Sequence, residues 1–189
     1  MNVSRRTVWG VALLLCFLGW LSVTGYPPIQ EYRLYLTQPR EAASLPWREL
    51  NASWDESTVR QRFVGFPMRC YGDGSGIPGA NRTCAVDLGS LNGVPAMYAN
   101  FFFGQKGLLR VGIAVPWWSH TASFASLHQE FGEPDATQTR FIAGVRLHGW
   151  KLADGAGVFC NVDRPINPLE PNSIQWVSAA ACGAGPCIK

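Results

Sequence analysis

The sequence predicts an α+β fold, in which an N-terminal membrane helix precedes an antiparallel β-meander with helices packed on one face. Three observations predict it. Residues 7–25 carry no charge and follow two arginines. Strand-like segments separated by glycine-rich turns occupy the middle of the chain. One amphipathic helix then separates these segments from a second strand-like set.

The N-terminal segment has the charge pattern of a membrane helix. Arg5 and Arg6 precede the uncharged residues 7–25, and the next charged residue is Glu31. Burying an ionised group in hydrocarbon is costly, and a retained anchor needs about 17–25 apolar residues. Basic residues stay on the cytoplasmic side, so the rest of the chain is expected to be exported. We therefore expect residues 1–25 to form a single-pass anchor that contacts the membrane through residues 7–25.

A cleaved signal segment is the alternative interpretation of the same residues. Val23, Thr24 and Gly25 loosely match the small residues that precede a cleavage site. Cleavage after Gly25 would release a secreted or periplasmic soluble module that begins at Tyr26. Both interpretations place the remaining chain in an oxidising compartment, where disulfides persist.

Five cysteines follow the apolar segment. Cys70 and Cys84 flank a glycine-rich loop, which a disulfide between them would close. Cys182 and Cys187 bracket a short Gly-Ala-Gly-Pro loop and could also pair, but a bridge from Cys160 to either one is equally open. One of the five must stay unpaired or bond to another chain. A buried, inert Cys160 is the favoured interpretation of this odd thiol.

Beyond the anchor, we divide the chain into an extended tether, residues 26–45, and an extracytoplasmic α+β domain, residues 46–189. Pro27, Pro28 and Pro39 favour extended backbone in the tether. The domain is expected to begin with helical structure over residues 46–63, where apolar side chains recur at helical spacing after a proline suited to a first turn.

The next part of the domain predicts β structure. A Gly-Gln-Lys-Gly turn at residues 104–107 separates two strongly apolar segments, which is a hairpin signal. After this turn, apolar residues alternate with Arg110, Gly112 and Ala114, as expected for a sheet with one covered face. The predicted strands span residues 66–71, 83–88, 95–103 and 108–115.

A helix and a second meander complete the predicted domain. Ser119 or Thr121 caps the helix, and Gly132 followed by Pro134 ends it. Turn residues then separate further strands, so that the order becomes helix, strands, helix, strands. These later strands are expected over residues 139–143, 146–152, 157–162 and 173–178.

Part of this pattern resembles a group of proteins. Residues 127–135 close the helix with an aromatic-Gly-x-Pro pattern, and a tryptophan-bearing strand follows at residues 149–152. With the strand pair that bounds the cysteine loop, these features are similar to small bacterial envelope proteins over about residues 63–162. Most such proteins have no known activity, and no catalytic residue is carried over. The resemblance implies a domain in the periplasm, tethered to the bacterial cytoplasmic membrane.

The composition argues against several classes of function. Charged residues make up 15% of the chain and the net charge is +3, which does not give the basic excess of a nucleic-acid-binding protein. There is no C-x-x-C motif, and His120 and His128 are two helical turns apart, so we expect no metal and no cofactor. A Cys160–His148 nucleophile pair is conceivable, yet nothing specifies an oxyanion site. We expect no enzymatic activity.

The adjacent Trp117 and Trp118 form a candidate interaction surface. Two neighbouring residues of a strand face opposite sides, so one ring can pack under the helix while the other is exposed. Burial of both rings in the domain core is the equally open alternative. The sequence thus predicts a membrane-anchored extracytoplasmic protein that acts as an interaction or accessory domain for an unknown protein partner. The alternatives are a secreted binding module and a thiol-dependent enzyme that uses Cys160.

Overall fold

The computed structural model describes residues 5–23, 26–72, 76–140, 145–182 and 187–188. The chain divides into two compact units, Met1–Gln38 and Pro39–Lys189. Several sequence predictions fall partly outside the described residues: residues 1–4 of the anchor segment, Thr24 and Gly25 of the cleavage site, residues 73–75 of the glycine-rich loop, residues 141–143 of a strand, and the loop between the last two cysteines.

The described part of the first unit contains two helices, α1 (Arg5–Val23) and α2 (Pro27–Thr37). The extended tether expected over residues 26–45 is therefore wrong across α2. The physical reason is that proline is tolerated in the first turn of a helix, where its missing N–H costs nothing. Within the described part of the chain, no helix combines the length and the apolarity that crossing a membrane requires.

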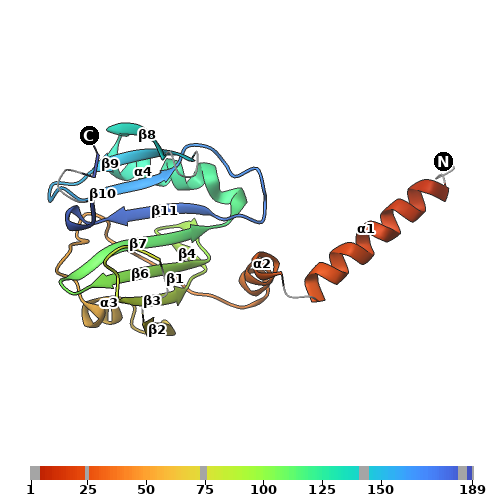
Figure 1. Cartoon of the computed structure of the whole chain (residues 1–189), viewed down its shortest axis with the longest axis horizontal. Helices are drawn as coiled ribbons and strands as arrows, with labels where there is room; N and C mark the ends of the chain where they lie inside the picture. Colours follow the sequence, from red (N-terminus) through yellow and green to blue (C-terminus); the bar gives the residue numbers. More distant parts are fainter. Residues whose placement is uncertain (1–4, 24–25, 73–75, 141–144, 183–186, 189) are drawn as a thin grey trace. The chain divides into compact units, whose positions relative to one another are not determined.

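The second unit is built on one eight-stranded, fully antiparallel sheet (Figure 1). Its strand order is β2-β3-β6-β7-β11-β10-β9-β8. The strands, in chain order, are β2 (Met68–Gly72), β3 (Arg82–Asp87), β6 (Tyr98–Gly104), β7 (Gly107–Val115), β8 (Ala136–Arg140), β9 (Val145–Lys151), β10 (Gly157–Asn161) and β11 (Asn172–Val177). The mixed α+β class with an antiparallel meander is confirmed.

The strand order shows an internal repeat of topology. Helix α3 (Glu56–Arg62) precedes the meander β2-β3-β6-β7, and helix α4 (His120–Phe131) precedes the meander β8-β9-β10-β11. The last strands of the two meanders, β7 and β11, pair antiparallel in the middle of the sheet. The two halves of the domain therefore meet at one seam, formed by β7 and β11.

One face of the sheet carries the core. A cross-strand row of directly paired residues runs through six strands on this face, and every member is buried: Cys84, Phe101, Val111, Trp176, Val158 and Trp150. Just past the end of α3, Phe63 packs edge-on against Phe101. From α4, Phe124 and Phe131 lie against Trp150. The two helices consequently cover the same face of the sheet, one in each half.

The segment before α3 is less helical than its spacing predicts. Residues 46–55 form turns, and only Glu56–Arg62 is helical. The Asn51 side chain accepts a hydrogen bond from the Ser53 amide at 2.7 Å, which offers the backbone an alternative to helix. Trp47 and Trp54 are nevertheless buried in the core. The turns of this segment therefore place the helically spaced apolar side chains in the core without forming a helix. A short sheet of β1 (Ala42–Ala43), β4 (Ser90–Leu91) and β5 (Val94–Pro95) supports this segment.

The opposite face, which we call the open face, is covered only in part by described residues. A small apolar cluster lies over β9, β10 and β11, where Ile188 packs with Leu147, Phe159 and Val177. Cys182 and Cys187 pack against this cluster. Ile188, near the C-terminal end of the chain, therefore covers part of the open face over β9, β10 and β11.

Candidate functional site

Both short cysteine loops are closed by disulfides. Cys70 and Cys84 are direct partners across β2 and β3, and Cys182 is bonded to Cys187. The predicted Cys70–Cys84 disulfide is confirmed, and of the pairings left open for the other cysteines the structure has Cys182–Cys187. Closing the first loop stabilises the fold by about 3 kcal/mol in the chain-entropy picture, and closing the shorter second loop by about 2 kcal/mol. Two disulfides indicate an oxidising, extracytoplasmic environment.

Cys160 is the unpaired cysteine of the folded unit, and it is buried. Burial removes the thiolate from water and raises the pKa of Cys160 to about 12. Its direct cross-strand partner is His148, as the conceivable nucleophile pair would need. The His148 Nδ1, however, lies 3.3 Å from the Thr137 hydroxyl, and burial lowers the pKa of this imidazole. The arrangement holds both groups neutral and does not activate the thiol.

Metal-ligating side chains do not form a usable site among the residues that the structure describes. One group of three ligand atoms, from Glu56, Cys70 and Cys84, lies within 4.8 Å of one another. Both sulfurs belong to a disulfide, and the Glu56 carboxylate already accepts hydrogen bonds from Arg60 and Arg82. Disulfide sulfurs are not the thiolates that bind metal ions, so this cluster is structural.

The two adjacent tryptophans take different environments. Trp117 is half-buried, and its indole Nε1 donates to the Pro165 carbonyl oxygen at 2.6 Å. Trp118 is 49% exposed. Both lie in a 3₁₀ turn, Trp117–Ser119, that leads from β7 into α4. The packed ring thus holds the turn in place, while the neighbouring ring faces solvent.

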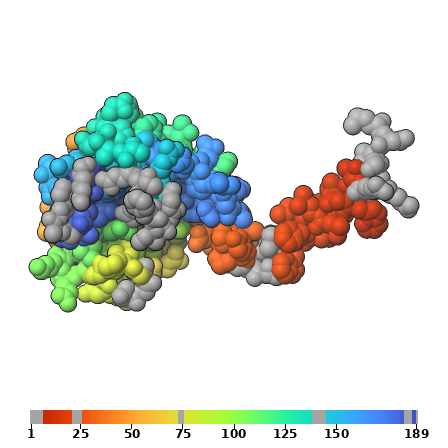
Figure 2. Space-filling model, turned by 45° about the horizontal axis from the view of Figure 1, so that its top comes forward, coloured from red at the N-terminus to blue at the C-terminus, as the bar shows by residue number. Residues whose placement is uncertain are grey.

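The packed Trp117 also fixes the loop between β10 and β11, residues 162–171. The Arg164 guanidinium stacks over the Trp117 ring, 4.6 Å from its centroid. Further along, the Asn167 side chain accepts from the Leu169 amide at 3.0 Å, which holds the loop in a turn. Between these two fixed points Ile166 is fully exposed, at 101%. Figures 1 and 2 show the loop in blue at the surface, and Figure 1 places it at the same end of the sheet as the start of α4.

Ile166 was not predicted from the sequence as a site residue. The sequence does contain a sign of it. Ile166 is an isolated apolar residue in a segment rich in proline and asparagine, where turns are expected and buried side chains are not. The proximity of this segment to the two tryptophans could not be derived, because it depends on how β7 and β11 pair.

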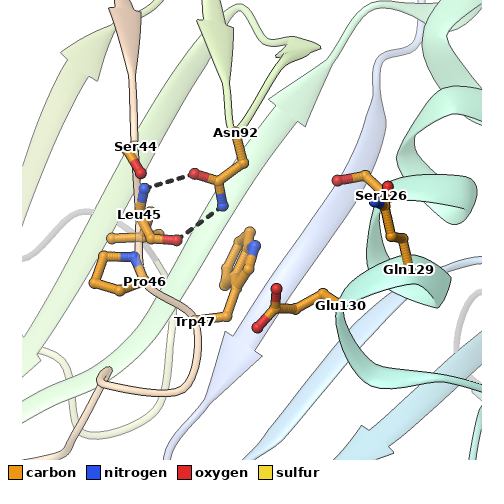
Figure 3. A pocket seen from close by; sticks show the side chains of 8 residues that line it. All are labelled: Ser44, Leu45, Pro46, Trp47, Asn92, Ser126, Gln129 and Glu130. Atoms are coloured by element: carbon orange, nitrogen blue, oxygen red, sulfur yellow. Dashed lines mark hydrogen bonds between the residues drawn. The ribbon is translucent and has the colours of Figure 1, made fainter.

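A separate cleft of about 510 Å³ lies between α4 and the segment around Trp47 (Figure 3). Asn92, which has a left-handed backbone with φ 50°, clamps Leu45 by accepting from its amide and donating to its carbonyl, both at 2.8 Å. Glu130 lines the other side and pairs with Arg48 at 3.0 Å. The polar groups that line this cleft thus hold the fold together, and we assign it no chemistry.

Comparison of the chain with known protein families, with curated proteins and with solved structures found no match.

Proposed function

We propose that this protein is a membrane-tethered extracytoplasmic domain that binds a protein partner through a surface formed by Trp118 and Ile166. The observation that carries the proposal is the exposure of these two large apolar side chains, which belong to a turn and a loop held together by the contacts of Trp117 with Pro165 and Arg164. Exposed apolar groups of this kind mark interaction sites when they cluster within a polar rim.

The character of α1 supports the tether. Between residues 7 and 20 this helix presents apolar side chains to solvent, including Trp9, Leu13, Phe17 and Trp20. Although α1 does not have the length and apolarity of a membrane span among the described residues, its exposed apolar side chains favour an apolar environment, and a bilayer would supply one. Arg5 and Arg6 at its start favour a cytoplasmic N-terminus, which puts the disulfide-bonded unit outside. The alternative, a secreted soluble module, would lose α1 by cleavage near Gly25.

The surface around Ile166 fits a protein partner. Asp163, Arg164 and Glu170 lie in the same loop as Ile166 and are exposed, and charged residues beside an apolar side chain are typical of the rim of a protein interface. Because Trp117 and Asn167 fix the loop, little conformational entropy would be lost on binding. The high pKa of the buried Cys160 argues against the thiol-enzyme alternative.

Site-specific photocrosslinking in the intact native host tests this function. A benzophenone amino acid is placed at position 166 or 118 and, as the matched control, at Val64, which is 78% exposed but lies in the other half of the domain. We expect positions 166 and 118 to crosslink the same protein, identified by mass spectrometry, and position 64 to give no such product. An Ile166→Asp substitution should abolish crosslinking from position 118. Identical products from all three positions, or none from 166 and 118, would contradict the proposal.

A further inference from the structure

The two cysteines of the Cys70–Cys84 disulfide differ in exposure. They are direct partners across β2 and β3, and β2 is the outermost strand of the sheet. Cys70 is half-buried, whereas Cys84 is fully buried in the core. A thiol that approaches the folded protein from solvent therefore reaches Cys70 before Cys84, and access decides which sulfur of a disulfide is attacked.

A guanidinium group contacts the more exposed of these two cysteines. Arg60, on α3, donates from its Nη2 to the Cys70 Sγ at 3.1 Å. A neutral sulfur accepts only weakly, but a thiolate is an anion and accepts strongly from a guanidinium. The contact therefore becomes stronger when the disulfide opens, and cations placed in this way stabilise the thiolates of reactive cysteines.

One carboxylate also lies close to the disulfide, but two cations compensate its charge. A carboxylate oxygen of Glu56 lies within 4.8 Å of both sulfurs and would oppose a thiolate there. Hydrogen bonds from Arg82 at 2.8 Å and from Arg60 at 2.9 Å lower the pKa of Glu56 and hold it ionised. The two guanidinium groups and the carboxylate together carry one positive charge, which favours an anionic sulfur.

We propose that the Cys70–Cys84 disulfide is a site of thiol–disulfide exchange with the dithiol of another protein. A thiolate of the dithiol attacks Cys70 Sγ, the bond between Cys70 and Cys84 breaks, and the electron pair leaves on Cys84, which takes up a proton. The second thiol of the dithiol loses its proton to solvent and attacks the dithiol sulfur bonded to Cys70, which leaves as a thiolate beside Arg60. The dithiol is oxidised to a disulfide, and the protein disulfide is reduced by the same two electrons.

The folded unit is expected to survive this opening. Five directly paired residues on each strand keep β2 in register with β3. Cys84 becomes a buried thiol, as Cys160 already is, and a buried thiol packs as a small apolar group. Exchange therefore frees the edge strand from its covalent bond to β3 and leaves the core in place. The exchange site does not depend on the Trp118–Ile166 surface.

Redox titration of the full-length protein in detergent micelles tests the proposal. The native protein is equilibrated in buffers of reduced and oxidised dithiothreitol and quenched with acid. After denaturation the free thiols are alkylated and located by peptide mass spectrometry. We expect Cys70 and Cys84 to be reduced reversibly while the circular-dichroism spectrum stays that of the folded protein. Reduction of this pair only together with unfolding would overturn the proposal.

Two substitutions at one ion pair separate an electrostatic role from a structural one. Arg60→Gln removes the donor to Cys70, so the equilibrium constant for reduction should fall about tenfold, which is about 30 mV for a two-electron couple. Glu56→Gln removes the carboxylate that opposes the thiolate, so the same constant should rise. Both variants break the Arg60–Glu56 pair. A merely structural role of this pair would move the constant in the same direction in both, and that result would contradict the proposal.

Arg62→Gln is the matched control. Like Arg60, Arg62 lies on α3, pairs with one glutamate and has a side chain that is 47% exposed. The Cys182–Cys187 disulfide is the second control, because its equilibrium constant should not change in any of these variants. An unchanged constant for Cys70–Cys84 in folded Arg60→Gln, or equal changes in Arg60→Gln and Arg62→Gln, would refute the site.

Discussion

At the scale of single residues, Cys160 shows how environment decides reactivity. The same thiol in a polar, accessible setting would be a candidate nucleophile, particularly opposite a histidine. Its position on β10 places it in the core beneath α4, where the thiolate is poorly solvated. The low reactivity of the Cys160 thiol therefore follows from its position on the core-facing side of β10.

Cys160 should react very slowly with alkylating reagents in the native protein. Its pKa of about 12 leaves almost no thiolate at neutral pH, and burial blocks access. Timed treatment with iodoacetamide, followed by peptide mass spectrometry, should show little labelling of Cys160 until a denaturant is added. Labelling at the rate of an unfolded cysteine would show that the thiol is accessible and would revive the thiol-enzyme interpretation.

At the scale of elements, short helix α3 depends on its cap. The Asp55 carboxylate accepts hydrogen bonds from the Thr58 amide and hydroxyl and from the Ser57 hydroxyl, each at 2.8 Å. These bonds, the Thr58 amide foremost, hold the pKa of Asp55 at about 2. A helix of two turns gains little from propensity alone, so the cap and packing at its ends sustain it.

Asp55→Ala should lower the melting temperature of the folded unit at neutral pH. Because the folded pKa of Asp55 lies below its ordinary value of 3.8, its contribution is present above that value and is lost as pH falls towards about 2. Circular-dichroism melts should therefore converge for wild type and variant between pH 4 and about 2. Glu170→Ala, which removes an exposed loop carboxylate, is the control. A difference that stays constant down to pH 2 would contradict the role of the ionised cap.

Elements were predictable where local pattern and tertiary packing agree. The hairpin at residues 104–107, the strand from Gly107 to Val115 and the end of the helix before Gly132 all follow from alternation and turn residues. At the start of that helix Ser119 occupies the N-cap position, but its side chain makes no capping hydrogen bond. Prediction failed where packing overrode the pattern. The spacing of Trp47, Leu50 and Trp54 indicated a helix, but their burial is achieved by turns. The prolines of α2 indicated extended chain, yet they occupy the first helical turn.

At the scale of the whole molecule, the decisive contacts are long-range. The pairing of β7 with β11 joins segments about 60 residues apart, and it brings the loop that carries Ile166 close to the tryptophans. Trp117, Trp118 and Ile166 each stand out in the sequence, but nothing local indicates that they lie close together, and the repeated helix-plus-four-strand topology has no local signature either. These features emerge only when the sheet is assembled.

The measurement that tests the account most directly is the intact mass of the protein in membrane and soluble fractions of its native host, with alkylation before and after reduction. We predict a full-length protein in the membrane fraction, with Cys70, Cys84, Cys182 and Cys187 alkylated only after reduction and denaturation. A soluble protein that begins at Tyr26 would contradict the tether. Alkylation of those four cysteines without reduction would contradict the extracytoplasmic assignment.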